Sequence, residues 1–222
     1  MTSSATIDDS INILLVDDHH LIVEGTINLL QKQYPNSQII VSQNVEDAKL
    51  QVSSRNPDIA IIDLSLPVEK GSKAQVENGM SLLEVLLTEY PDLNIMVQSS
   101  HTKALIRLKH KIDEHQGGFT IADKNISSQE MLDMLDWAIK GVTHTKVLNT
   151  SLELKPEWLE VLNLAFKEGL QDKAIAKKMF KSERMIRHYW SKIQDVLEIY
   201  PSKGANIRSL TLIRAREEGL VD

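Results

Sequence analysis

Short apolar runs alternate with amphipathic segments over the first 140 residues. Rich in Ile and Val and bounded by turn residues, these runs are Ile11–Val16, Gln38–Val41, Asp58–Ile62, Asn94–Gln98 and Phe119–Ala122. Between them, apolar residues recur with a period near 3.6, which predicts helices over Leu21–Tyr34, Val45–Ser54, Met80–Tyr90 and Gln129–Ile139. A proline follows each of the first three helices. The alternation predicts an α/β fold, a doubly wound, five-stranded parallel sheet covered on both faces.

The second half of the chain has no further strand pattern after Trp137. Its helical segments are expected over Pro156–Glu168, Asp172–Phe180, Ser182–Ile199 and Asn206–Glu218, with Ser182 as an N-cap. Residues 141–153 are Thr-rich and aperiodic, which is typical of a linker. We therefore expect a flexible tail over 1–10, an α/β domain over 11–140, the linker over 141–153 and a small all-α domain over 154–222.

Composition narrows the class of protein. The 222 residues are 42% hydrophobic and 25% charged, the usage of a folded protein rather than a disordered one. The absence of Cys excludes disulfides, zinc fingers, iron–sulfur clusters and Cys nucleophiles. No apolar run approaches the roughly 18 residues of a membrane span, and the polar start MTSSATIDDS does not resemble a signal peptide. We expect a cytoplasmic protein with no membrane partner.

The net charge of -6 is distributed unevenly. Residues 1–152 hold 12 Lys and Arg against 20 Asp and Glu, whereas residues 153–222 hold 13 against 11. The first region is therefore strongly acidic and the second slightly basic. This asymmetry indicates two domains that meet different partners.

Polar residues follow the predicted strands at the edge where ligands bind in open α/β sheets. Asp17 and Asp18 follow the first strand, Asp63 the third, Ser99 the fourth, and Lys124 lies shortly after the fifth. Carboxylates crowded at one edge repel one another unless a cation joins them, and Mg²⁺ suits oxygen ligands. One Asp could then act as a nucleophile and form an aspartyl phosphate, while the Lys and Ser side chains bind phosphoryl oxygens.

Two simpler interpretations apply to these polar residues. Each Asp alone could be a solvated turn residue, but three at converging strand ends favour a site. His19 and His20 are also candidates for metal ligands, but no other His lies near them in the pattern. We interpret the two His residues as the start of a helix.

The motifs ILLVDDHHL, IAIIDLSLP and IMVQSSH give residues 11–140 a resemblance to the receiver domain of two-component response regulators, which has a flavodoxin-like fold. The resemblance implies that a sensor histidine kinase, or a phosphotransfer protein, transfers a phosphoryl group to Asp63. It also implies that Asp17, Asp18 and Asp63 hold Mg²⁺.

Two features depart from the receiver pattern. The stretch VEKGSKAQVEN, residues 68–78, is longer than usual and predicts an extended loop. Receivers also place their lysine three residues after an aromatic residue of the fifth strand, and counting from Phe119 gives Ala122. Lys124 lies two residues further, on the same side of an extended strand. We assign the lysine role to Lys124; if Ala122 holds that position instead, the phosphorylated switch would be weakened or absent.

Residues 172–187, DKAIAKKMFKSERMIR, carry six basic groups against two acidic ones. Two helices joined by a short basic turn suit double-stranded DNA, because such a unit contacts phosphates and inserts its second helix in the major groove. The alternative is a helical bundle with a solvated basic face.

Residues 154–222 resemble the LuxR/NarL class of helix-turn-helix domains. The resemblance implies that Arg187, His188, Ser191 and Lys192 face DNA, and that Lys181, Arg184 and Arg208 contact phosphates. Three positions depart from the class, namely Met185, Tyr189 and Val196, and the insert YPSKGAN before the last helix is longer than typical.

Three functions remain in competition. The first is a non-enzymatic transcription regulator that is phosphorylated at Asp63 and dimerises when active. The second keeps the DNA-binding module but works without phosphorylation. The third is a Mg²⁺-dependent phosphohydrolase, which would need a second carboxylate two residues after the nucleophile, where this chain has Ser65.

Overall fold

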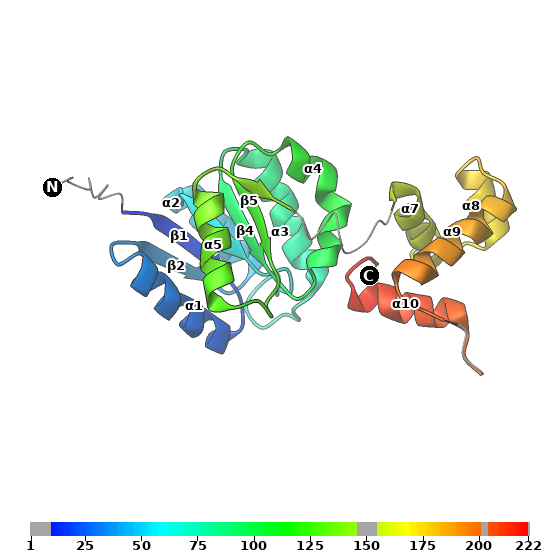
Figure 1. The fold of residues 1–222 in the computed structure, drawn as a ribbon, viewed down its shortest axis with the longest axis horizontal. Helices are drawn as coiled ribbons and strands as arrows, with labels where there is room; N and C mark the ends of the chain where they lie inside the picture. Colours follow the sequence, from blue (N-terminus) through cyan, green and yellow to red (C-terminus); the bar gives the residue numbers. More distant parts are fainter. Residues whose placement is uncertain (1–9, 146–154, 201–203, 222) are drawn as a thin grey trace. The chain divides into compact units, whose positions relative to one another are not determined.

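The structure is a computed structural model, and it describes residues 10–145, 155–200 and 204–221. These residues divide into two compact units (Figure 1). The N-terminal unit contains residues 10–100 and 110–145. The C-terminal unit contains residues 155–200 and 204–221, together with the short segment 101–109.

The N-terminal unit is built on a parallel sheet with the strand order β2-β1-β3-β4-β5-β6. The strands are β1 (Asn12–Val16), β2 (Gln38–Ser42), β3 (Ile59–Ile62), β4 (Asn94–Gln98), β5 (Phe119–Ala122) and β6 (Thr143–His144). The predicted α/β fold, doubly wound and parallel, is confirmed. The predicted number of five strands is one too few.

The sixth strand lies in the stretch that we expected to be a linker without strands. Phe119 pairs with Thr143 and Thr120 with His144, so β6 extends the sheet beyond β5. Gly141 makes the turn into this strand with a φ of 76°, which favours glycine. A strand of two residues is too short to produce a period-2 pattern, which is why the sequence did not reveal it.

Helices cover both faces of the sheet (Figure 1). α1 (His20–Gln33) and α5 (Ser128–Ile139) share one face with the cluster of Ile13, Ile59, Met96 and Leu135, while α2 (Val45–Arg55) and α3 (Val76–Glu89) pack together on the other. Between β4 and β5 run a 3₁₀ helix, Thr102–Leu108, and α4 (Lys109–Glu114). The central strands are buried on both faces, which explains why their sequences are near-continuous apolar runs rather than alternating ones.

The segment 68–78 is only partly the extended loop that we expected, because α3 begins at Val76 rather than at Met80. The rest of the loop is held by main-chain hydrogen bonds. Leu66 and Gln75 form an antiparallel bridge, and the N–H groups of Val45 and Glu46 donate to carbonyls at the start of the loop, each at 3.1 Å. The loop is thereby fixed to the start of α2.

The C-terminal unit contains α7 (Pro156–Phe166), α8 (Asp172–Lys178), α9 (Glu183–Val196) and α10 (Ile207–Glu217). As predicted, Pro156 opens α7 and Ser182 caps α9, its hydroxyl accepting a hydrogen bond from the Met185 N–H at 3.2 Å. In the part of the chain that the structure describes, no helix has the length and apolar character needed to span a membrane.

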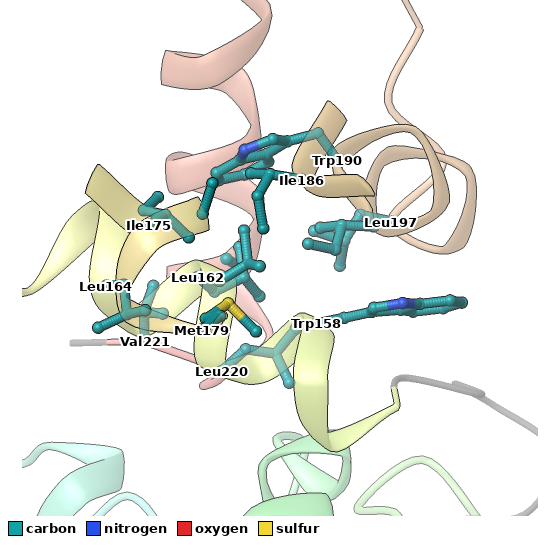
Figure 2. Close-up of a cluster of buried hydrophobic side chains, with 14 residues drawn as sticks. Trp158, Leu162, Leu164, Ile175, Met179, Ile186, Trp190, Leu197, Leu220 and Val221 are labelled. Atoms are coloured by element: carbon teal, nitrogen blue, oxygen red, sulfur yellow. The ribbon is translucent and has the colours of Figure 1, made fainter. Parts of the chain in front are cut away.

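One apolar cluster holds the C-terminal helices together. Figure 2 shows Leu162 of α7, Ile175 of α8, Ile186 of α9 and the terminal Leu220 directed into it. All four side chains are 0–1% exposed. These short helices are therefore stabilised by packing against one another, since none is long enough to be stable alone.

Candidate functional site

The site begins with two carboxylates on neighbouring strands. Val16 of β1 pairs with Ile62 of β3, so Asp17 and Asp63 leave the sheet side by side at its carboxyl edge. Both residues are only 3% exposed. The Asp63 N–H donates to the Val16 carbonyl at 2.9 Å, which fixes the backbone of the site to the sheet.

Lys124 joins these two carboxylates. Its Nζ donates to Asp17 Oδ2 at 2.7 Å and to Asp63 Oδ2 at 2.8 Å. β5 ends at Ala122, and the Asp123 carboxylate then accepts a hydrogen bond from the Asn125 N–H at 2.9 Å. This turn directs Lys124 back over the sheet edge. Ala122 is instead fully buried in the core, so the lysine two residues beyond the usual spacing is the one that reaches the site.

Opposing effects act on the protonation of Lys124. Burial lowers its pKa, but the hydrogen bonds and negative charges of Asp63 and Asp17 outweigh burial and leave the pKa above the ordinary value of 10.5. The ammonium is therefore charged at neutral pH. It neutralises part of the charge of the two carboxylates.

Asp18 and His19 complete a cluster with Asp17 and Asp63 in which one ligand atom from each residue lies within 4.8 Å of the others. His19 is the N-cap residue of α1, as we interpreted it, but its Nδ1 also lies 3.2 Å from Asp17 Oδ1 and 2.9 Å from Asp18 Oδ1. Asp18 Oδ1 is buried and accepts no hydrogen bond from the described residues. A buried carboxylate oxygen that accepts no hydrogen bond fits a bound cation, so the oxygen atoms of this cluster suit a hard divalent ion.

Ser99 lies where the sequence predicts it, directly after β4, and is completely buried. Its N–H donates to the Ala122 carbonyl at 3.0 Å. This hydrogen bond fixes the backbone of Ser99 to the end of β5, and Lys124 follows the same strand end two residues later.

In the C-terminal unit, α9 presents a polar face. The side chains of Arg187, His188, Ser191 and Lys192 are all exposed, while Ile186, Trp190 and Ile193 are buried against the core. Offsets of one, four and five residues place the first set on one side of a helix. Lys181 and Arg184, at the turn before α9 and in its first turn, are exposed as well.

Arg208 differs from the other predicted phosphate contacts. Its Nη2 donates to both carboxylate oxygens of Asp172, at 2.7 and 3.0 Å, and its guanidinium lies 3.4 Å from the ring centroid of Trp190. The Trp190 Nε1–H also donates to Asp172, at 3.1 Å. These contacts join α8, α9 and α10, a structural role that the sequence pattern did not reveal; the phosphate contact stays a prediction.

Comparison with known proteins identifies the family of the N-terminal unit. Residues 13–136, more than half of the chain, match the model of the response regulator receiver domain. The chain belongs to the response regulator family.

Two curated relatives align with this response regulator over nearly its whole length. It is 25% identical to the DNA-binding transcriptional activator DevR/DosR of Mycobacterium tuberculosis, covering 94% of this chain and 98% of the relative. It is also 25% identical to the transcriptional regulatory protein LnrK of Bacillus subtilis, covering 90% and 96%.

Solved structures support the fold of the whole response regulator. A structure of two RcsB dimers bound to two parallel DNAs has a TM-score of 0.64 at 21% identity and covers 95% of this chain and 99% of that one. RcsB from Salmonella enterica serovar Typhimurium, bound to a promoter, has a TM-score of 0.61 at 21% identity and covers 94% and 98%. At this identity the likeness supports the fold of the two units.

Proposed function

We propose that this response regulator accepts a phosphoryl group on Asp63 and controls transcription by binding DNA through its C-terminal unit. The observation that carries the proposal is the bridge from Lys124 to Asp17 and Asp63. It supplies the cation that the receiver resemblance requires, although the usual sequence position holds Ala122.

In the proposed reaction, a carboxylate oxygen of Asp63 attacks the phosphorus of a phosphorylated histidine on a sensor kinase or phosphotransfer protein. The P–N bond breaks, the imidazole leaves, and an acyl phosphate forms on Asp63. Lys124 remains near Asp17 and would donate to a phosphoryl oxygen, because its ammonium already lies 2.8 Å from Oδ2 of the Asp63 carboxylate that receives the phosphoryl group. Ser99 would donate its hydroxyl to another oxygen.

A divalent cation fits the same site. Asp17, Asp18 and Asp63 would hold Mg²⁺, which when bound neutralises negative charge on the phosphoryl group during transfer. The buried Oδ1 of Asp18, which accepts no hydrogen bond from the described residues, supports this assignment. His19 would stay outside the ligand set, since Mg²⁺ prefers oxygen ligands.

The proposal for DNA rests on the exposed polar face of α9 and the basic turn before it. Arg187, His188, Ser191 and Lys192 would enter the major groove, and Lys181, Arg184 and Arg208 would contact phosphates. DevR/DosR is named as a DNA-binding activator, and the matching RcsB structure contains dimers on DNA. We therefore propose double-stranded DNA as the target and a homodimer as the active form.

Two experiments test the two halves of the proposal. Purified protein with Mg²⁺ and radiolabelled acetyl phosphate should become labelled, whereas the Asp63→Asn variant should not. Selection of DNA sites from a random pool, with and without the phosphodonor, should recover a motif whose affinity rises on phosphorylation. Equal labelling of wild type and variant would refute the assignment of Asp63 as the phosphoacceptor. Recovery of no DNA motif would refute sequence-specific DNA binding by the C-terminal unit.

The phosphorylation-independent alternative retains one supporting feature, the long loop 68–78 beside α2. It predicts the same DNA affinity for wild type, phosphorylated protein and Asp63→Asn. The phosphohydrolase alternative is disfavoured because relatives over at least 90% of the chain are named as transcription regulators.

A further inference from the structure

Phe180 is the most exposed large apolar side chain among the described residues. It lies in the turn between α8 and α9, and 95% of it is exposed. An exposed aromatic ring gains no hydrophobic stabilisation from the fold.

The backbone at Phe180 is also unfavourable for this residue. Its φ is 53°, in the left-handed region where glycine or Asn is usual at the end of a helix. Two hydrogen bonds impose this conformation, from the Phe180 N–H to the Lys177 carbonyl at 3.3 Å and from the Lys181 N–H to the Ala176 carbonyl at 2.9 Å. Neither the packing nor the local conformation of the unit therefore accounts for a phenylalanine here.

The surroundings of the ring are cationic. Lys177 and Lys181 flank Phe180 in the chain, and Arg184 follows in the first turn of α9; all three are exposed. A second copy of the same basic surface would be repelled by this charge, whereas a polyanion would be attracted. The charge around Phe180 thus favours a polyanion such as a nucleic acid over a second copy of this basic surface.

We propose that Phe180 is a DNA-contacting residue whose ring packs against a deoxyribose of the DNA backbone at the rim of the major groove. The proposal rests on the DNA binding proposed above. In a helix-turn-helix unit the first helix crosses the backbone and the N-terminal part of the second reaches the base edges, so the turn between them lies at the groove rim. There the ring would exclude water beside phosphates that the neighbouring cations bind.

The test combines DNA affinity with stability in the full-length protein. The probe is a fluorescein-labelled duplex of random sequence, because contact with a sugar needs no particular base. In the Phe180→Gly variant we expect DNA binding about tenfold weaker, with a melting temperature equal to or above that of wild type, since glycine relieves the left-handed strain. The Phe180→Tyr variant keeps the ring and should bind within about twofold of wild type.

Salt dependence separates the ring from the charges around it. The logarithm of the affinity falls with the logarithm of salt concentration by about 0.9 for each phosphate neutralised. Phe180→Gly should keep the wild-type slope, whereas Lys181→Gln should reduce it by about one. Ile213→Ala, which truncates another exposed apolar residue on α10, is the matched control and should change neither affinity nor slope.

Each contrary result has a distinct meaning. Equal DNA affinity of wild type and Phe180→Gly would overturn the role of Phe180 and leave the DNA-binding proposal intact. A weaker affinity accompanied by a lower melting temperature would assign Phe180 to the stability of the turn and also overturn it. Failure of the wild type to bind DNA would overturn the proposed function itself.

Discussion

Removing the charge of Lys124 should destabilise the N-terminal unit in a way that added Mg²⁺ repairs. The Lys124→Met variant keeps most of the length of the side chain but leaves Asp17 and Asp63 without their cation. The side chains of these carboxylates are 4% and 3% exposed, and that of the lysine is 16% exposed. Water can therefore compensate only in part for the lost partner.

The magnitude follows from the two contacts of 2.7 and 2.8 Å. At an effective dielectric constant of about 20, each attraction is worth about 6 kcal/mol before the cost of desolvation is subtracted. Breaking a buried ion pair by removing one partner costs about 3–5 kcal/mol net. We expect a loss of about 3 kcal/mol in the free energy of unfolding at pH 7 without metal. With saturating Mg²⁺ the loss should be about 1–2 kcal/mol smaller, because the variant site lacks the positive charge of the lysine and should bind the cation more tightly than the wild-type site.

The assay is urea denaturation read by hydrogen exchange of the β1 and β3 peptides, which isolates unfolding of this unit. Lys111→Met is the matched control, because Lys111 pairs with Glu84 at a similar 2.9 Å but both side chains are at least 40% exposed. It should cost less than about 1 kcal/mol. A loss for Lys124→Met no larger than the control, or one that Mg²⁺ does not reduce, would refute the assignment of Lys124 as the counter-ion of the site.

The difference in the free energy of unfolding between wild type and Lys124→Met should also change with pH in a direction set by the pKa of Lys124. The pKa of Lys124 is raised in the folded protein above its ordinary value of 10.5, so folding favours the protonated amine. Its stabilising contribution is therefore fully present below pH 10.5 and is lost as the pH rises through the higher folded-state pKa. The stability difference between wild type and Lys124→Met should stay constant from pH 7 to pH 9 and shrink above pH 10.5.

Further predictions concern packing in each unit. In Gly118→Ala the new Cβ would lie 2.0 Å from the Ala138 carbonyl oxygen, so α5 must shift, and we expect a loss of about 1–3 kcal/mol in thermal unfolding. Gly25→Ala, on the exposed side of α1 with nothing within 4 Å, should instead stabilise by up to about 1 kcal/mol. Asp172→Ala removes both hydrogen bonds to Arg208 and should lower the stability of the C-terminal unit by about 1–3 kcal/mol; an unchanged melting temperature would contradict that structural role.

Much of the fold could be predicted because its signals are long. Runs of four to six residues, at least three of them apolar, mark each of the first five strands, and the structure places these strands within one residue of the predicted bounds. The two-residue β6 and the first turn of α3 at Val76 have no such signal. Both depend on tertiary hydrogen bonds, to β5 in one case and around the Leu66–Gln75 bridge in the other.

The sequence could predict which residues of the candidate site lie at the strand ends. It could not predict which side chains contact one another there. Asp17 and Asp63 meet because β1 and β3 are neighbouring parallel strands that end at one edge of the sheet, as the doubly wound pattern implies. The choice between Ala122 and Lys124 depended on a turn set by the Asp123 carboxylate, which no spacing rule contains. The approach of His19 to the carboxylates was missed because an N-cap position gives no information about where its side chain points.

The short strand β6 also has a mechanical consequence. Among the described residues it is the last element of the N-terminal unit, and it is joined to β5 through two residue pairs. Because the two strands are parallel, tension applied to the C-terminal end of β6 along the strand direction would load this pairing in shear. The first structure to yield under such a load would be β6, while the other five strands and the carboxylates at their ends kept their positions.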